Sequence, residues 1–570
     1  MRTIRVGNCS GFYGDRLSAL REMLEAGPLD YLTGDYLAEL TMLILGKDRA
    51  RDPALGYAKT FARQISDCLA LARGKGVRIV ANAGGLNPAG LAELVRTIAA
   101  DQRLEIRVAH VEGDDLLAHA EEHGWKGALT ANAYLGAFGI AETLRAGADV
   151  VVTGRVTDAA LTLGPAIAEF AWSREDFDLL AAGVVAGHVL ECGTQATGGN
   201  YSGFTGLDTS APLGFPIAEI SADGTAVITK HPGTGGAVSV DTVTAQLVYE
   251  VAEPLYLNPD VSTRLDTVRL EQIGRDRVRV SGVVGQAPPG TTKVAVGSVG
   301  GHRNSVEFVL TGLDIEQKAA WVRRQLEYAL APTPPQELTW ELVRTDRPDP
   351  ATQAQASALL RCHARDSDPD RVGRAFTSAA VELALASYPG FFVTAPPGPA
   401  TPFGVFRAAY LPQASVPHTA VLPDGSRVRI PPPAATTPPA PADLTPRPAE
   451  RFGGPTTTAP LGRVVFARSG DKGGSANIGV WVPADAPRRA EVYAWLSGWL
   501  NAEAVKRLLP ETADLKVTVH RLANLSAVNI VVDGLLGEGV ASSTRFDPQA
   551  KAVGEWLRAR HVPIPSEFLI

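Results

Sequence analysis

Residues 3–190 repeat one pattern, in which a short apolar strand runs into a polar, glycine-rich loop and a helical segment follows. Strands that alternate with helices form parallel sheets through right-handed crossovers. The chain is therefore expected to contain an open, mostly parallel α/β sheet, or else a distorted partial barrel. The predicted strands lie at residues 3–6, 29–32, 77–81, 105–109 and 149–152.

Four parts of the chain differ in their pattern. Residues 1–214 hold the strand–helix repeat, and residues 215–430 read as an α+β second half of the same body, with strands that include 294–299 and 306–310. Residues 431–460 carry ten of the chain's 41 prolines and few apolar residues, which predicts a semi-rigid linker. Residues 461–570 read as a small α+β domain.

Composition excludes several classes of protein. Apolar residues make up 45% of the chain and charged residues 20%, which is typical of a globular protein. No apolar run approaches the ~20 residues that span a bilayer, and the first residues do not read as a signal peptide. A net charge of −7 gives no electrostatic footprint for nucleic acid. The four scattered cysteines do not suggest a disulfide scaffold, so we expect a cytoplasmic protein without nucleic-acid or membrane partners.

Polar and glycine residues gather in the loops that follow the predicted strands. Ligands of an open parallel sheet bind beyond the carboxyl ends of its strands, so these loops are expected to form one binding rim. The alternative for any single residue is that it makes a turn or a helix cap. The candidate ligand-binding residues of the rim are Ser10, Gly11, Asp15, Asn82, Gly84, Gly85 and Asn87, with Asn8, Asp35, Glu112 and Asp114 nearby.

The segment ADVVVTGRVTDAAL places Arg155 and Asp158 between a strand and a helix. The planar fork of arginine suits a carboxylate or a phosphate. Asp158 is interpreted either as a catalytic group or as the N-cap of the following helix, and both alternatives stay open. Glu112, Asp114 and Asp158 are the carboxylates that would suit Mg²⁺, which needs few protein ligands.

The segment GHVLECGTQATGGNY places His188 and Glu191 three residues apart on one helical face. Such a pair performs acid–base chemistry when its pKa values lie near neutrality. Cys192 follows, as a nucleophile if its pKa is lowered, or more simply as a small buried hydrophobe. Gly198 and Gly199 are further candidates for ligand binding.

Two later glycine-rich segments are candidate ligand loops. In ITKHPGTGGAVSV, exposed amides ahead of a helix would bind an anion such as a phosphate, although a plain glycine turn is the alternative. In ARSGDKGGSANIGV, the predicted turn is too long and too polar for a minimal hairpin, which indicates a site loop contributed across a domain or subunit boundary; an ordinary flexible turn is the alternative. The candidate residues are Lys230, Thr234, Gly235, Gly236, Asp471 and Lys472.

Common catalytic motifs are missing from the sequence. It contains no HExxH, no CxxC and no clustered His/Asp metal pattern, and the GxSxG of α/β-hydrolases does not occur. The residues thus imply no firm cofactor.

The chain resembles the acyclic terpene utilisation (AtuA-like) family in seven stretches, which are SGFYGDR, NAGGLNP, GADVVVTGRVTDAAL, GHVLECGTQATGG, ITKHPGTGGAVS, TVTAQLVYE and SGDKGGSANIGV. The resemblance implies a fused C-terminal ferredoxin-like domain, which in relatives can be a separate short chain. It also implies the breakdown of branched, isoprenoid-derived acids as coenzyme A thioesters, without an agreed reaction or agreed catalytic residues. Cys9 departs from the family pattern, where a glycine or another small residue is expected.

Three functions fit these features. The first is a lyase of the hydration–dehydration type or an isomerase, acting on an acyl-CoA or a related carboxylate. In it Arg155 orients the substrate, Asp158 or the Glu191–His188 pair moves a proton, and loop amides stabilise an enolate-like oxygen. The second is a thioester or lactone hydrolase that uses a bound water or Cys192. The third is a non-catalytic acyl-CoA-binding or scaffold subunit. Coenzyme A is then part of the substrate, and a homo-oligomer is the default assembly.

Overall fold

The computed structural model describes residues 2–440 and 454–569 of the chain. Contacts between residues divide it into two compact units: the first joins Met1–Gly297 to Phe406–Ile570, and the second is Ser298–Val405. Compactness does not test which parts fold on their own, so the four predicted domains stay a prediction. Residues 441–453 of the predicted linker lie outside the described residues.

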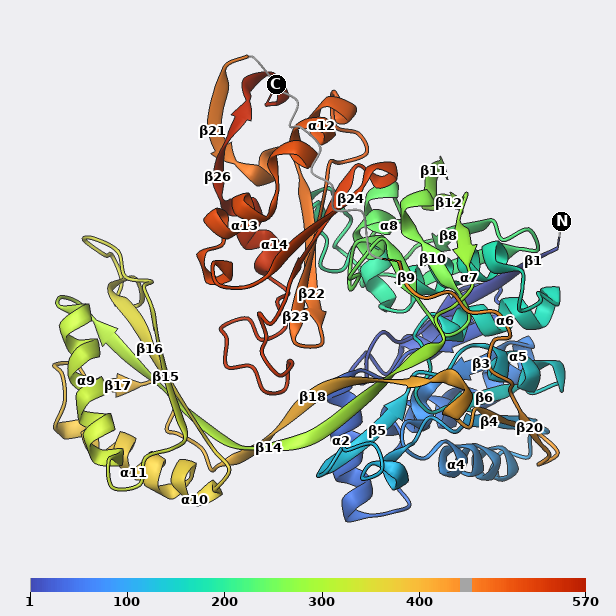
Figure 1. Ribbon diagram of the computed structural model, residues 1–570, viewed down its shortest axis with the longest axis horizontal. Coiled ribbons are helices and arrows are strands. Elements are labelled where there is room, and N and C mark those ends of the chain that lie inside the picture. Colours follow the sequence, from blue (N-terminus) through green and yellow to red (C-terminus); the bar gives the residue numbers. More distant parts are fainter. Residues whose placement is uncertain (1, 441–453, 570) are drawn as a thin grey trace. The chain divides into compact units, whose positions relative to one another are not determined.

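The first unit is built on a mixed sheet whose centre is parallel, which confirms the predicted α/β class (Figure 1). All five predicted strands are present. In spatial order they are β1 (Thr3–Asn8), β2 (Tyr31–Gly34), β3 (Arg78–Ala81), β6 (Val150–Thr153) and β4 (Val108–Glu112). Antiparallel strands extend the sheet at both edges. They are β7 (Pro216–Ser221), β8 (Ala226–Lys230), β12 (Arg277–Ser281) and β11 (Arg269–Gly274) beside β1, and β19 (Thr419–Val421) and β20 (Arg427–Arg429) beside β4.

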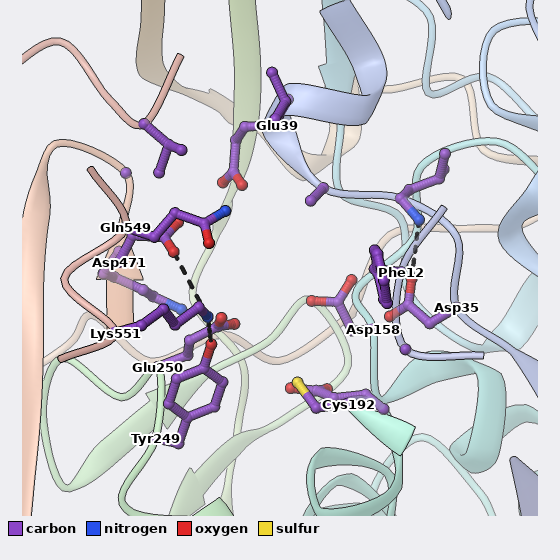
Figure 2. Close-up of a pocket in the computed structure, with 18 of the residues that line it drawn as sticks. Phe12, Asp35, Glu39, Asp158, Cys192, Tyr249, Glu250, Asp471, Gln549 and Lys551 are labelled. Atoms are coloured by element: carbon purple, nitrogen blue, oxygen red, sulfur yellow. Dashed lines mark hydrogen bonds and ion pairs between the residues drawn. The ribbon is translucent and has the colours of Figure 1, made fainter. Parts of the chain in front are cut away.

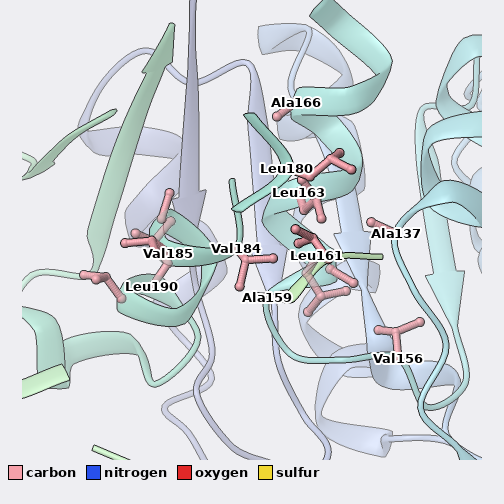
Figure 3. Packing of buried hydrophobic residues seen from close by; sticks show 14 of the residues in the cluster. Ala137, Val156, Ala159, Leu161, Leu163, Ala166, Leu180, Val184, Val185 and Leu190 are labelled. Atoms are coloured by element: carbon pink, nitrogen blue, oxygen red, sulfur yellow. The ribbon is translucent and has the colours of Figure 1, made fainter. Parts of the chain in front are cut away.

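Helices cover both faces of this sheet, because successive strand residues point to opposite sides. Ile79 packs in one core cluster and its neighbour Val80 in the other. One face carries α1 (Ala19–Ala26), α3 (Lys59–Lys75) and α4 (Pro88–Asp101). The other carries α5 (Phe138–Arg145), α6 (Ala160–Phe170) and α7 (Phe177–Leu190), whose packing Figure 3 shows.

Glycine lets α7 come close to the loop that carries Asp158. A Cβ atom on Gly187 would lie 2.7 Å from the Cα of Ala159, which is closer than real side chains approach. His188 and Glu191 follow directly at the end of the same helix. The close approach therefore brings the His188–Glu191 segment beside the loop of Arg155 and Asp158.

Strands predicted at 294–299 and 306–310 form one long strand, β14 (Thr291–Thr311). The polar sequence GGHRN between them resembles a turn, but partner strands hold it extended: β16 (Ser357–Asp366) pairs with residues 302–311, and β18 (Thr401–Pro412) pairs with β14 as well. Sequence reasoning also missed β5 (Ala128–Ala133), which pairs with β14. The boundary between the two units falls inside β14 and β18.

The second unit is an antiparallel sheet with helices and its own apolar core. Its strands lie in the order β15 (Glu337–Val343), β16, β14 and β17 (Phe392–Val393). The core contains Phe308, Leu360 and Phe376, which are fully buried. The helices are α9 (Ile315–Leu330), α10 (Pro369–Val372) and α11 (Arg374–Val381).

The C-terminal module, residues 456–569, is an α+β sandwich inside the first unit. Its antiparallel sheet has the order β22 (Phe466–Lys472), β23 (Ser475–Trp481), β25 (Ala527–Val532) and β24 (Val517–Leu522). One face packs against α12 (Arg489–Trp499), α13 (Ala502–Leu508) and α14 (Val553–Ala559). The residues Thr456–Pro460, at the end of the predicted linker, form β21, which pairs with β26 (His561–Pro565).

The prediction that the turn in ARSGDKGGSANIGV is too long for a minimal hairpin is wrong. Lys472 pairs with Ser475, so β22 and β23 form a hairpin with a two-residue turn, Gly473–Gly474. The strands continue through Asp471 because the hairpin packs against other parts of the unit, and its polar tip resembled a long loop only in sequence.

The remaining elements of the first unit are α2 (Glu39–Arg51), α8 (Val240–Leu247) and a small sheet of β9 (Leu255–Leu257), β10 (Ser262–Arg264) and β13 (Val284–Gln286). Across the part of the chain that the structure describes, no helix has both the length and the apolar character needed to cross a membrane.

Candidate functional site

A cavity of about 480 Å³ opens at the carboxyl ends of the parallel strands of the first unit. Its walls come from the loops after β1, β2, β5 and β6, from the ends of α7 and α8, from β14 and from the C-terminal module (Figure 2). The volume is in the range of small-molecule sites. Eight predicted site residues line it: Gly11, Asp15, Arg155, Asp158, Glu191, Gly199, Asp471 and Lys472.

Arg155 and Asp158 form an ion pair at the wall of the cavity. The Arg155 Nη2 lies 2.9 Å from Asp158 Oδ1, and the arginine side chain is 4% exposed. Arg155 also donates to the carbonyl of Leu37 at 2.8 Å and stacks on Tyr134 with its guanidinium carbon 4.3 Å from the ring centre. Its guanidinium thus makes several contacts within the protein, and both members of the pair line the cavity; Figure 2 shows the Asp158 carboxyl there.

The structure does not use Asp158 as a helix cap. The residue at the N-cap of α6 is Ala159, and no side chain caps that helix. Burial raises the pKa of Asp158, although the charge of Arg155 opposes the shift. Asp158 is therefore a carboxyl that holds its proton more tightly than a surface aspartate does.

Asp35, at the end of β2, is a second buried carboxyl of the wall. Its Oδ1 accepts hydrogen bonds from Asn82 Nδ2 at 2.6 Å and from the amide of Leu37 at 3.1 Å. Burial and the negative charge of Asp158 raise its pKa well above the usual range. Asn82 does not line the cavity but holds Asp35 from behind.

His188 and Glu191 form a buried pair, with 3.0 Å between His188 Nδ1 and Glu191 Oε1. Their other polar atoms, His188 Nε2 and Glu191 Oε2, have no hydrogen-bond partner among the described residues. Burial raises the pKa of Glu191 to about 7. Burial disfavours a charged His188, but the Glu191 carboxylate raises its pKa. The pair can therefore hold or release one proton near neutral pH.

Lys293 on β14 forms an ion pair with Glu39 at the start of α2. Their Nζ and Oε1 atoms are 3.2 Å apart, and the Tyr134 hydroxyl donates to the same oxygen at 3.2 Å. Despite burial, the charges of Lys293 and Arg155 lower the pKa of Glu39 to about 2. Glu39 is consequently an ionised carboxylate, unlike its neighbours in the cavity.

The C-terminal module supplies the opposite wall, where Figure 2 shows Asp471 and Lys551 facing Asp158 across the cavity. Burial and the negative charge of Glu250 raise the pKa of Asp471 to about 7. Lys551 Nζ lies 3.9 Å from Asp471 Oδ1 and donates to the hydroxyl of Tyr249. No carboxylate of the described residues lies within ion-pair distance of Lys472, whose Nζ is 5.8 Å from the ring centre of Tyr256.

The remaining predicted rim residues serve the fold outside the cavity. The Ser10 hydroxyl donates to the carbonyl of Phe12 at 3.0 Å, and Asn87 caps α4 by accepting from the amide of Gly90 at 2.9 Å. Gly84 and Gly85 allow close packing, since a Cβ atom on Gly84 would lie 2.5 Å from the Thr153 carbonyl. Here the turn-and-cap alternative describes the residues better than ligand binding.

The predicted Mg²⁺ carboxylates are not brought together. Asp114 is buried behind the wall, where it accepts from the amide of Arg155 and from Asn132, both at 2.8 Å. Glu112 pairs with Arg427, and of the three only Asp158 lines the cavity. Over residues 2–440 and 454–569, no group of three or more His, Cys, Asp or Glu side chains is arranged to hold a metal ion.

The glycine loop at 231–236 is not part of the cavity either. Two of its amides are already used, because Gly235 donates to the carbonyl of Pro212 at 3.0 Å and Gly236 to that of Asp208 at 2.9 Å. Lys230 Nζ donates to the carbonyl of Thr234 at 2.8 Å. In this structure the segment is a glycine turn, and no amide of Gly235 or Gly236 is left for an anion.

Cys192 lines the cavity, but its surroundings disfavour the thiolate form of its side chain. Burial and the charges of Glu250 and Glu191 raise the pKa of its thiol well above the usual range. Since the thiolate is the nucleophile, this environment disfavours the nucleophilic alternative.

Sequence reasoning missed several residues of the cavity. They stand singly on elements far apart in the chain, where no local spacing marks them. Three of them lie in stretches that carry the family resemblance: Phe12 is in SGFYGDR, and Tyr249 and Glu250 end TVTAQLVYE. The missed residues are Phe12, Glu39, Tyr134, Tyr249, Glu250, Lys293, Phe406, Gln549 and Lys551.

Comparison with known families matches two parts of the chain. Residues 4–422 match the family described as acyclic terpene utilisation family protein AtuA. Residues 459–563 match the AtuA ferredoxin-like domain. No curated protein matches the chain.

Proposed function

The chain belongs to the acyclic terpene utilisation family AtuA, and from this premise we propose that it is an enzyme that moves a proton next to the carbonyl group of a branched, isoprenoid-type acid derivative. The reaction is of the lyase type, gaining or losing water, or an isomerisation. One observation carries the proposal: two carboxyls with raised pKa values, Asp158 and Glu191, line one cavity.

In the direction of water loss, the roles follow from the surroundings of each group. Asp158, held by Arg155, removes the proton from the carbon beside the carbonyl. The Lys472 ammonium holds the carbonyl oxygen as negative charge develops on it. Glu191, protonated with the help of His188, gives its proton to the hydroxyl on the next carbon, which leaves as water. In an isomerisation the proton returns to a different carbon.

Loop amides do not carry the oxyanion in this proposal, because the protein uses them. Gly11 donates its amide to Asp15 Oδ2 at 2.9 Å, and Gly199 donates to the carbonyl of Thr194 at 2.9 Å. Cationic side chains on the C-terminal module take that part instead. The thioester form of the substrate rests on the family resemblance, and the free acid is the second form to test.

The test compares Asp158→Asn with Asp176→Asn, a matched change outside the cavity. Each protein is incubated with branched enoyl-CoA and 3-hydroxyacyl-CoA thioesters and with the matching free acids, and mass spectrometry follows the gain or loss of water. We expect Asp158→Asn to lower turnover by about 10²-fold or more. Its melting temperature should stay within about 3 °C, because asparagine keeps an oxygen for Arg155.

Other outcomes would redirect the proposal. Unchanged turnover in Asp158→Asn contradicts the role of Asp158. Release of free coenzyme A without a change in the acyl group supports a thioester hydrolase. Tight binding with no product from any thioester or acid supports a non-catalytic subunit.

A further inference from the structure

We propose that Tyr249 is a second catalytic hydrogen-bond donor of the cavity, acting on a carbonyl or carboxylate oxygen of the substrate. Lys551 directs its hydroxyl, and Asn477 and Asn529 of the C-terminal module hold it in place. The inference rests on the proposed function and extends it, because it adds a second donor that residues of the module position.

The hydroxyl of Tyr249 has a free proton that lies against the cavity. Lys551 Nζ donates to the Tyr249 oxygen. An ammonium group has donors only, so the tyrosine oxygen must be the acceptor, and its own proton is left for another partner. No acceptor for this proton is found among residues 2–440 and 454–569, and Tyr249 lines the cavity.

Two cations lie against the ring of Tyr249. The guanidinium carbon of Arg468 lies 4.3 Å from the ring centre, and Lys551 Nζ lies 4.7 Å from it. Positive charge over the face of an aromatic ring is attracted to its π electrons, which helps to hold the ring in place. Burial and the charge of Glu250 raise the pKa of Tyr249 well above its usual range. Tyr249 is therefore a protonated donor at neutral pH and not a phenolate.

Two asparagines on the sheet of the C-terminal module bind the backbone around Tyr249. Asn477 Oδ1 accepts from the amide of Glu250 at 2.7 Å, and Asn477 Nδ2 donates to the carbonyl of Val248 at 3.1 Å. Asn529 Nδ2 donates to the carbonyl of Val251 at 2.8 Å. These bonds fix the segment on both sides of Tyr249.

Glu250 is held in a backbone conformation that a glutamate rarely adopts. Its φ is 57°, in the left-handed region that favours glycine. Such strain persists only where the surroundings impose it, and it gathers at functional sites. Here the surroundings include Asn477, which binds the Glu250 amide. The strained turn presents both Tyr249 and Glu250 to the cavity.

The experiment compares Tyr249→Phe with Tyr201→Phe. Tyr201 is also buried and contacts the module through Phe466, with 5.3 Å between ring centres, but it does not line the cavity. With a branched enoyl-CoA that turns over, we expect Tyr249→Phe to lower kcat by about 10²-fold with a smaller change in KM, because losing one oxyanion donor costs about 10²–10³. Tyr201→Phe should behave like the wild type.

Lys551 is a positioning residue and has its own test. Lys551→Met removes the donor that orients Tyr249 and should lower kcat, whereas Lys551→Arg keeps a donor and should restore part of it. A merely structural role would not distinguish the two by kcat while their melting temperatures match.

Binding separates the failure of this inference from the failure of the proposed function. A saturated branched acyl-CoA of the same length, which cannot react, should bind Tyr249→Phe about five-fold more weakly than Tyr201→Phe. If no thioester turns over but this difference holds, the donor stands and the reaction is wrong. If Tyr249→Phe binds and turns over like the wild type, the donor is wrong, and a wild type that binds neither ligand overturns both proposals.

Discussion

Glu191 and His188 share a buried position in which neither can ionise without affecting the other. Glu191 Oε2 and His188 Nε2 are left without partners among the described residues, and of the two residues Glu191 lines the cavity, where a ligand could complete its carboxyl group. Their contact of 3.0 Å also ties the proton of Glu191 to the charge of His188. A proton donor of this kind works only while it still carries its proton, which makes its rate sensitive to pH.

The ionisation of Glu191 should be visible in the pH dependence of kcat/KM. The pKa of Glu191 is raised to about 7, so the group is protonated below pH 7 and loses its proton as the pH rises. Because it acts as an acid in the direction of water loss, we expect kcat/KM in that direction to fall above about pH 7. Glu191→Gln should be slower and lack this limb, while Glu93→Gln, on the exposed face of α4, keeps it. A profile in Glu191→Gln that still falls near pH 7 contradicts the assignment.

At the scale of residues, the sequence could predict those site members that sit together in short motifs. Arg155, Asp158, His188 and Glu191 were found because a strand end and a helix end each placed two polar residues three apart. Glu39, Lys293 and Lys551 could not be found this way. Their importance comes only from contacts between elements, such as the 3.2 Å between Lys293 and Glu39, 254 residues apart in the chain.

At the scale of elements, regular hydrophobic patterns gave reliable strands in the parallel sheet. They failed where pairing decides the structure. Polar GGHRN stays extended inside β14 because β16 pairs with it from His302 onward, and the tip of the β22–β23 hairpin shortens to two residues because Asp471 and Lys472 remain in the ladder. A ladder partner distant in sequence leaves no mark on the local pattern.

Because α7 lies close to the Asp158 loop at Gly187, we expect a single added methyl group at this position to affect both stability and turnover. Gly187→Ala would place a Cβ atom 2.7 Å from backbone atoms of Ala159, so α7 or the loop must shift. We expect a loss of about 1–3 kcal/mol in the free energy of unfolding and a loss of turnover larger than this destabilisation explains. Denaturant unfolding and steady-state kinetics measure the two.

Gly74→Ala is the matched control, since it is also a glycine inside a helix. A Cβ atom there meets nothing within 4 Å. It should stabilise the protein by about 0.5–1 kcal/mol and leave turnover unchanged, as alanine favours the helix. If Gly187→Ala behaves like this control, the close approach does not position the site.

At the scale of the whole molecule, buried acids couple stability to pH. The pKa values of Asp114, Glu191 and Asp471 are all raised to about 7, so the folded protein binds these protons more tightly than the unfolded chain. Their stabilising effect is complete below about pH 4, and it is lost as the pH rises to about 7. Buried histidines such as His418, whose pKa burial lowers to about 3, act in the opposite direction.

The difference in melting temperature between Asp114→Asn and the wild type isolates the contribution of Asp114. Asp114→Asn cannot ionise, so its melting temperature relative to the wild type should rise between pH 5 and pH 8. The change corresponds to a free energy on the order of 2–4 kcal/mol. Asp176→Asn should show a constant difference across the same range. A constant difference for Asp114→Asn as well would mean that Asp114 is ionised throughout.

The cavity is lined by residues of the body, the last of which is Phe406, and by residues of the C-terminal module from Asp471 onward, which carries a consequence for gene organisation. Joining both parts in one polypeptide keeps each module near its own partner at an effective concentration of about millimolar, whatever the abundance of the protein. Two separate chains with the same division would have to find each other, and their activity would fall with dilution. A fused gene thus fixes the stoichiometry of the two halves at one to one and removes any need to match their expression.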